Sequence, residues 1–130
     1  MQPIRLPIPP VSTNQIHRGR RYKSKQARQF ESDIATLLAV KCRDIQLPDG
    51  ELALHIRVGT TRQMDVDNAL KLLIDCIARH YGINDRRFTA LSIVRVPVKQ
   101  NEGFITFAIE PFQYADFPQL IVGEPNARHA

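Results

Sequence analysis

The sequence predicts an α+β fold, a small mixed sheet with helices packed on it. Strand-like and helix-like patterns follow one another in the order β-α-β-α-β-β, which is typical of that class. The 130 residues can bury one core, and the 43% hydrophobic and 24% charged fractions are typical of a globular chain. We therefore expect one domain over residues 1–110, with residues 111–130 as a C-terminal tail or appended element.

The first half of the chain predicts an edge strand, a loop and a helix. Residues 2–8 have alternating apolar side chains but several prolines, which restrict a strand to a sheet edge. Residues 11–23 combine turn formers with dense arginine, which indicates an exposed loop. Ser24 is the expected N-cap of an amphipathic helix that continues to Lys41. A Pro-Asp-Gly turn follows within residues 47–50.

The second half predicts a buried helix between strands. Residues 51–58 alternate cleanly between apolar and polar, as in a strand with one buried face. Residues 67–80 have apolar positions around most of a helix, which we expect inside the domain and ended by Gly82. Residues 90–98 and 104–110 are two further strands, and the link KQNEG between them is typical of a hairpin.

The positive charge is concentrated near the N-terminus. The chain has a net charge of +5, yet the first 30 residues contain no acid, and the first carboxylate is Glu31. A segment of one sign in a basic protein favours a polyanionic partner, most simply nucleic acid, although a solvated basic face is the alternative. The cations expected to hold backbone phosphates are Arg18, Arg20, Arg21, Lys23 and Lys25.

The sequence contains no apolar run of the length that spans a bilayer and no signal-peptide pattern at its start. We therefore expect no membrane contact and a cytoplasmic location. Cys42 and Cys76 stand at apolar helical positions, where burial as small hydrophobes is favoured over a disulfide or a metal site.

Two carboxylates, Asp65 and Asp67, stand where the second helical pattern begins. An acid at a helix start caps an amide and interacts with the macrodipole, a contribution of about 0.3–1 kcal/mol that could by itself explain Asp67. Asp65 lies outside the first turn. Because residues two apart in an extended segment point to the same side, both carboxylates could face one divalent cation such as Mg²⁺.

Asp85 supplies a third acid, directly ahead of the last two strands. Capping does not account for it, but a turn, or a salt bridge with Arg86 or Arg87, would. Three acids in this arrangement within a basic protein fit a metal-dependent phosphodiesterase, in which a cation activates water and neutralises charge on the phosphate.

Lys71 lies one turn beyond Asp67. It either forms an i,i+4 ion pair, worth about 0.2–0.5 kcal/mol, or places its ammonium beside a scissile phosphate. Asp75 repeats the spacing, and we expect it to pair with Lys71 or Arg79 rather than to bind metal.

Other catalytic chemistries lack their motifs. The sequence has no phosphate-binding glycine loop, no H-E-x-x-H, no C-x-x-C and no serine in a nucleophile-elbow context. The histidines show no ligand spacing: His17, His55, His80 and His129. Among them only His17, in the arginine-rich loop, is a candidate phosphate contact, and a solvated loop histidine is the favoured alternative.

The stretch MDVDNALKLLIDCIARHYGINDRR, residues 64–87, resembles the hallmark segment of the RusA-like Holliday-junction resolvases, endodeoxyribonucleases found in lambdoid prophages. That family has D-x-D-N, a lysine, a helical Asp, a Gly and an acidic pair ahead of a strand. The matching residues here are Asp65-Val66-Asp67-Asn68, Lys71, Asp75, Gly82 and Asn84-Asp85. Residues 9–14, PPVSTN, are similar to the family's P-P-x-S-x-N opening, and the similarity spans about residues 3–110.

The resemblance implies a catalytic site with Mg²⁺ bound by Asp65, Asp67 and Asp85, and with Lys71 as the catalytic lysine. It also implies a homodimer that resolves four-way DNA junctions by paired symmetric nicks, in recombination and repair. A two-fold dimer suits a junction with two-fold symmetry.

The chain departs from the family pattern at two positions. Asn84 stands where the family has the first acid of its pair, which weakens a metal site without abolishing it. The family's arginines before D-x-D are reduced to Arg62, the remaining expected DNA contact there. In addition, a helix over residues 67–80 is about 20 Å long, so Asp85 either returns along it or completes the partner subunit's site.

Two other functions stay open on the sequence. One is a non-catalytic module that binds branched DNA, for which Asn84 is the motivating residue. The other is a nuclease that acts on flaps or RNA. A purely structural protein would leave the three acids unexplained.

Overall fold

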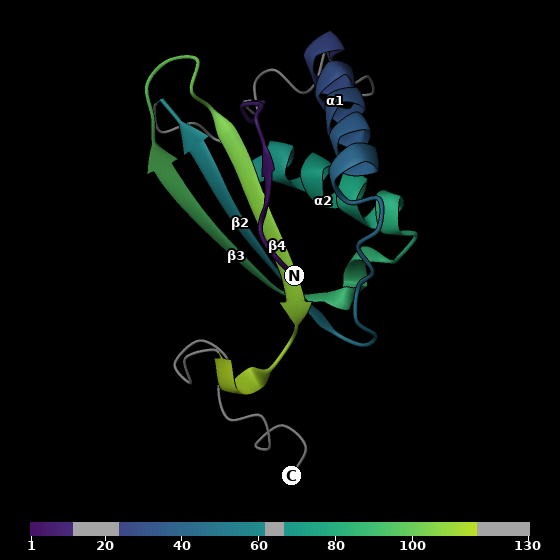
Figure 1. Cartoon of the computed structure of the whole chain (residues 1–130). Coiled ribbons are helices and arrows are strands. Elements are labelled where there is room, and N and C mark those ends of the chain that lie inside the picture. Colours follow the sequence, from purple (N-terminus) through teal and green to yellow (C-terminus); the bar gives the residue numbers. More distant parts are fainter. Residues whose placement is uncertain (12–23, 62–66, 117–130) are drawn as a thin grey trace.

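Four strands form one mixed sheet in the order β1-β4-β2-β3, and two helices cover one of its faces (Figure 1). The computed structural model describes residues 1–11, 24–61 and 67–116. The predicted fold class and element order are confirmed. The elements are β1 (Ile4–Leu6), α1 (Lys25–Lys41), β2 (Leu52–Thr60), α2 (Asp67–Tyr81), η2 (Asp85–Arg87), β3 (Phe88–Pro97), β4 (Phe104–Pro111) and η3 (Tyr114–Asp116).

Helix α1 begins as its sequence predicts. Ser24 has an extended backbone, and its hydroxyl accepts a hydrogen bond from the amide of Ala27 at 3.1 Å, so it is the N-cap. The buried residues recur three or four positions apart and turn one stripe of the helix towards the sheet: Ala27, Phe30, Ile34 and Leu38.

Helix α2 lies largely inside, as predicted, and ends at a glycine. Leu73 and Ile77 are fully buried. Gly82 adopts a φ of +66°, and its amide donates to the carbonyl of Arg79 at 3.2 Å while Ile83 donates to Ala78 at 3.0 Å. These two bonds form a Schellman motif, which turns the chain away from the helix.

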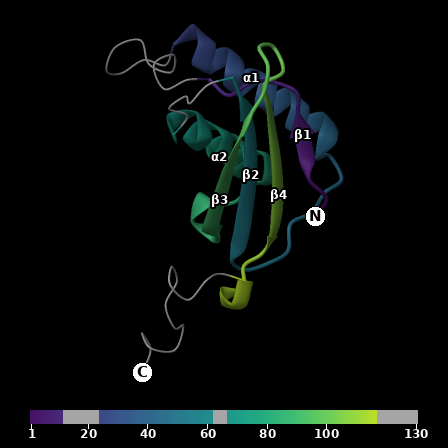
Figure 2. The same ribbon diagram turned by 90° about the vertical axis from the view of Figure 1, so that its left-hand side faces the viewer.

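The core lies between the helices and one face of the sheet. Leu54, Ile56 and Val58 of β2 all point to that face and are buried, which confirms the predicted alternation. Across the ladder they oppose the buried residues of β4: Ile109, Phe107 and Ile105. The other face of the sheet carries no helix of the described segments (Figure 2). None of the described helices has both the length and the apolar character needed to cross a membrane.

Strands β3 and β4 do not form the predicted hairpin. β3 pairs in parallel with β2, whereas β4 pairs antiparallel with the opposite edge of β2. The link KQNEG therefore passes the end of β2, with Asn101 in the left-handed region at a φ of +68°. The link has the length and composition of a hairpin loop, but β2 is the most buried of the strands and lies between two neighbours.

Candidate functional site

A cavity of about 590 Å³ lies at the end of the sheet where β2 finishes. Three segments far apart in the sequence meet there, namely the prolines after β1, the end of β2 and the link between β3 and β4 (Figure 1). The lining residues are Pro7, Pro9, Pro10, Gly59, Thr60, Thr61, Gln100, Asn101 and Gly103.

Two glycines allow these segments to approach closely. A Cβ at Gly59 would lie 2.4 Å from Cδ1 and Cε1 of Phe104, which stands opposite it on β4. A Cβ at Gly103 would lie 2.6 Å from Cβ of Pro9. The Arg5 guanidinium stacks over the Phe104 ring at 4.2 Å from its centroid. The frame of the cavity is therefore tightly packed, and larger residues cannot replace these glycines without displacing their neighbours.

The predicted acidic segment is attached to this end of the sheet. Asp65 and Arg62 lie outside the described residues, but the segment that holds them joins Thr61, which lines the cavity, to the start of α2. α2 begins at Asp67 itself, near the same end (Figure 1). Of Asp67 only the backbone is described, so its expected carboxylate role stays a prediction.

The predicted basic loop is attached at the same end. Residues 12–23, with His17 and the predicted phosphate contacts Arg18, Arg20, Arg21 and Lys23, lie outside the described residues. Their flanking residues are described: Pro10 lines the cavity, and Ser24 starts α1 at this end of the molecule (Figure 1). Lys25, the first residue of α1, is exposed.

Lys71 extends from α2 one turn after Asp67 and is exposed. Asp75 is half-buried, and the structure places no ion pair between it and either Lys71 or Arg79, all three of which are described. Since no described acid pairs with Lys71, its ammonium can meet an anionic ligand near the start of α2.

Asp85 lies at the opposite end of the sheet. Phe88, three residues further on, is registered with Leu52 at the start of β2, whereas Thr60 at its end is registered with Pro97. Eight strand steps of about 3.3 Å put roughly 26 Å between those ends. The residues before Asp85 do not run back along α2. One subunit therefore holds Asp85 far from the cavity at the end of β2, and its described residues contain no group of three metal-ligating side chains.

The neighbours of Asp85 have structural roles that the sequence left open. The Asn84 side chain accepts a hydrogen bond from the amide of Arg86 at 2.9 Å and caps η2. The Arg87 guanidinium donates to the carbonyls of Gly50 and Pro48. A turn, rather than a salt bridge, is thus the local reason for this sequence, and the exposed Asp85 carboxylate has no ion-pair partner among the described residues.

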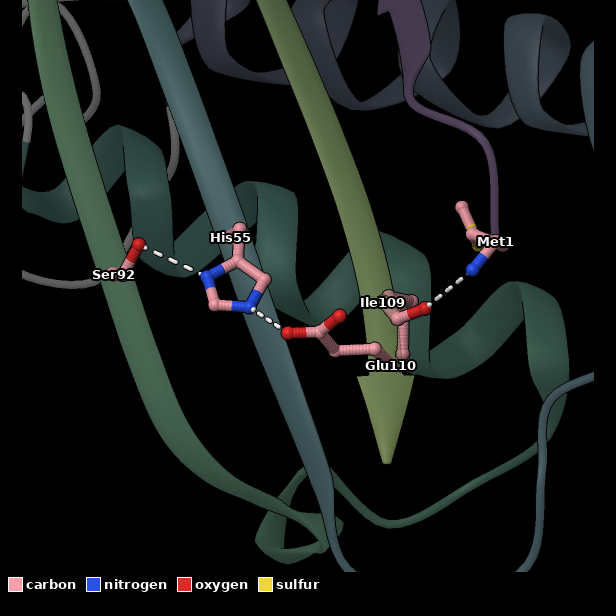
Figure 3. A network of polar contacts seen from close by, with 5 residues as sticks. All are labelled: Met1, His55, Ser92, Ile109 and Glu110. Carbon is pink, nitrogen blue, oxygen red and sulfur yellow. Dashed lines mark hydrogen bonds and ion pairs between the residues drawn. The ribbon is translucent and has the colours of Figure 1, made fainter. Parts of the chain in front are cut away.

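A row of three polar side chains, Ser92, His55 and Glu110, crosses the open face of the sheet (Figure 3). The sequence alone did not predict this row. His55 of β2 lies between Ser92 of β3 and Glu110 of β4, with Nδ1 at 3.1 Å from Ser92 Oγ and Nε2 at 2.8 Å from Glu110 Oε1. The Glu110 carboxylate accepts from Nε2, which leaves Nδ1 of the neutral ring to accept from the serine hydroxyl. Beside this row the amine of Met1 donates to the Ile109 carbonyl at 3.2 Å. The His55 side chain therefore links β2 to both β3 and β4 through hydrogen bonds.

Cys42 and Cys76 are both buried thiols, and their burial confirms the prediction. Burial raises the pKa of Cys42, with smaller opposing effects from Tyr81 and Lys41. Burial, and then the neighbouring Cys42 thiol, raise the pKa of Tyr81. The Tyr81 hydroxyl is buried, and no hydrogen bond of ordinary geometry satisfies it within the described part of the chain. Neither group reaches the cavity at the end of β2.

A small α+β domain that attaches an acidic segment and a basic loop to one sheet end has the features of a protein that processes nucleic acid. Comparison with known families identifies which one. Residues 7–110 match the family model described as "Endodeoxyribonuclease RusA", so the chain belongs to that family and is an enzyme that hydrolyses DNA phosphodiester bonds. Membership implies the nuclease activity of a Holliday-junction resolvase, and with it junction binding and dependence on a metal. A search of curated proteins found no significant match.

Proposed function

We propose that this protein is a Mg²⁺-dependent endonuclease that resolves four-way DNA junctions by paired symmetric nicks during recombination and repair, and that it works as a homodimer. The observation that carries the proposal is the meeting of segments at one end of β2. The D-x-D segment, the arginine-rich loop and the start of α2 all connect to residues around the same cavity.

Asp65 and Asp67 would hold the metal in this proposal. Carboxylate oxygens are the ligands that Mg²⁺ prefers, and it commonly takes one or two of them together with water and substrate phosphate. A bound metal of this kind lowers the pKa of water and neutralises charge on the phosphate. Lys71, exposed on the next turn of α2, would place its ammonium beside the scissile phosphate.

The first turn of α1 supports a DNA contact. Lys25 and Arg28 stand there without any acid, although a cation at a helix N-terminus is disfavoured by about 0.3–1 kcal/mol. An anionic ligand offsets this repulsion, and amides at the same terminus favour phosphate. Together with the loop cations Arg18, Arg20, Arg21 and Lys23, and with Arg62 beside the acids, these residues would hold DNA backbone phosphates.

The third acid, Asp85, would come from the second subunit. It is exposed and about one sheet length from the cavity of its own subunit. A two-fold dimer that sets the start of β3 against the partner's cavity would complete two equivalent sites, one for each strand to be cut. Mixing subunits that carry Asp67→Asn or Asp85→Asn separates this arrangement from a site within one subunit.

Cleavage of a synthetic four-way junction tests the proposal. The wild type is compared with Asp67→Asn, with and without Mg²⁺, and with the control Asp44→Asn, which changes an exposed acid after α1. We expect symmetric nicks from the wild type and the control only when Mg²⁺ is present, and none from Asp67→Asn. Tight junction binding without nicks under any divalent metal would instead indicate a binding module. Faster cutting of flaps or RNA would indicate the other nuclease class.

A further inference from the structure

A pocket of about 250 Å³ lies on the open face of the sheet, beside the Ser92–His55–Glu110 row (Figure 3). Residues of β2, β3 and β4 line most of it, among them Arg57, Thr106, His55 and Ser92. Glu110, whose carboxylate accepts a hydrogen bond from His55, does not line it. The polar groups of the pocket therefore offer positive charge and hydroxyls, which is the chemistry that binds an anion.

Two arginines flank Thr106 on this face. The ladder registers Thr106 of β4 with Arg57 of β2 and with Arg5 of β1, so all three side chains point away from the helices. Neighbouring strands lie about 4.8 Å apart, so roughly 10 Å separates the backbones of the two arginines. Both arginines are exposed, and neither has an acidic partner in the described part of the chain. An anion above Thr106 would interact favourably with both charges.

The side chain of Arg5 is already held in position for such a contact. Its guanidinium stacks over the buried Phe104 ring, 4.2 Å from the centroid. Stacking uses the flat face of the guanidinium and leaves the N–H donors at its edge available for hydrogen bonds. Arg5 therefore loses less conformational entropy when it binds an anion than an unsupported arginine side chain would.

The pocket lies next to the cavity at the end of β2. Arg57, which lines the pocket, and Gly59, which lines the cavity, stand two positions apart on β2 and therefore on the same face. Two strand residues span about 7 Å. DNA carries one negative charge per about 1.7 Å of helix axis, so a duplex that leaves the cavity along the open face presents phosphates to this pocket.

We infer that the open face of the sheet binds a backbone phosphate of DNA, through Arg57 and Thr106 in the pocket and Arg5 beside it. The occupant is a phosphodiester of the duplex arm that leaves the cavity, and to this extent the inference rests on the proposed function. Charge complementarity supports it, because two exposed arginines face a polyanion in a chain of net charge +5. Contacts of this kind fix the position of the duplex and carry no sequence preference.

The salt dependence of DNA binding tests this contact without any cleavage. A short fluorescent duplex is titrated with protein in EDTA at about 50 to 200 mM salt, and its affinity is measured by anisotropy. Each phosphate contact contributes about 0.9 to the slope of log affinity against log salt. Arg57→Gln should therefore reduce the slope by about 1, and the double variant with Arg5→Gln by about 2, with unchanged circular dichroism spectra. The matched control Arg43→Gln, which changes an exposed arginine after α1, should leave the slope unchanged.

A wild-type slope for Arg57→Gln, or equal reductions in Arg57→Gln and the control, would overturn the inference. If inorganic phosphate alone shifts the NMR signals of Thr106 while duplex binding is independent of Arg57, the pocket binds a small anion and the DNA contact is wrong. Nicking of junctions is scored separately. A wild type that nicks, with an unchanged Arg57→Gln slope, removes only this contact, whereas a reduced slope in a protein that never nicks removes only the nuclease proposal.

Thr106→Glu gives a second test that keeps both arginines. The new carboxylate would lie between the two guanidinium groups and occupy the place of the phosphate. We expect duplex affinity at low salt to fall by at least about 10-fold, while the melting temperature stays equal or rises because the added acid pairs with the arginines. The control Thr36→Glu adds the same charge at an exposed threonine of α1 and should retain the wild-type affinity. A Thr106→Glu protein that binds the duplex as tightly as the wild type would contradict the inference.

Discussion

Replacement of Gly59 by alanine tests the packing that frames the cavity, because the sign of its effect depends on one neighbour. At an unobstructed strand position, alanine is more stable than glycine by roughly 0.5–1 kcal/mol. Here the new Cβ would lie 2.4 Å from two atoms of the Phe104 ring, which is buried and held beneath the Arg5 guanidinium. Overpacking of this kind costs about 1–3 kcal/mol. We therefore expect Gly59→Ala to lower the free energy of unfolding by that amount.

A double-mutant cycle with Phe104→Val isolates the cause, because valine lacks both ring atoms that meet the new Cβ. In that background Gly59→Ala should be neutral or stabilising, giving a coupling energy of roughly 1–4 kcal/mol. Urea denaturation of the four proteins measures it, and thermal unfolding should show the single Gly59→Ala variant melting about 4–12 °C lower. Additive effects, or a stabilising Gly59→Ala in the wild-type background, would refute this description of the packing.

Three further changes have defined outcomes. Ser24→Ala removes the acceptor for the Ala27 amide and should cost about 1 kcal/mol in urea denaturation; no loss would mean that the cap is redundant. Lys71→Ala should reduce junction cleavage about 10²-fold or more while binding and melting temperature stay unchanged, whereas a purely structural lysine would change melting and spare cleavage. Burial raises the pKa of Cys42 and Tyr81 above 9.0 and 10.0, so stability should be constant below pH 9 and decrease as the pH rises beyond it. Tyr81→Phe should reduce that alkaline loss and, because the buried hydroxyl has no neighbour but the weakly accepting Cys42 thiol, leave the neutral-pH stability nearly equal; an unchanged alkaline loss would exclude Tyr81 as its source.

The sequence predicted elements whose signals are local. The Ser24 cap, the period of α1, the glycine after α2 and the alternation of β2 each depend on residues within a few turns of one another, and the structure confirms all four. The bounds differ by only a few residues, most at the first strand, which Pro7 confines to Ile4–Leu6.

Features that depend on strand order could not be predicted from local sequence signals. The KQNEG link has hairpin composition, yet β3 and β4 are separated by β2. The same placement sets Ser92 and Glu110 on either side of His55, a contact between residues 37 and 55 positions apart. The far position of Asp85 also follows from it, because a strand parallel to β2 must start at the end where β2 starts.

The candidate site likewise has features that local sequence predicts and features that depend on the fold. Residue types and spacing predict site roles for Asp65, Asp67, Lys71 and the basic loop, and these roles stay predictions. The same signals were not enough to reveal that Asp85 lies a sheet length away or that Asn84 caps a turn. Both of these depend on how the chain leaves α2, which the Schellman bonds around Gly82 decide.

The most direct test of this account is complementation between two inactive subunits. Asp67→Asn and Asp85→Asn proteins are each unfolded, mixed, refolded and assayed on a four-way junction with Mg²⁺. If the partner subunit supplies Asp85, each heterodimer has one site with both lesions and one intact site, so the mixture should regain single nicks at about a quarter of the wild-type number of sites. If each site lies within one subunit, every site in the mixture is defective, and the absence of nicks would contradict the shared site proposed for this resolvase.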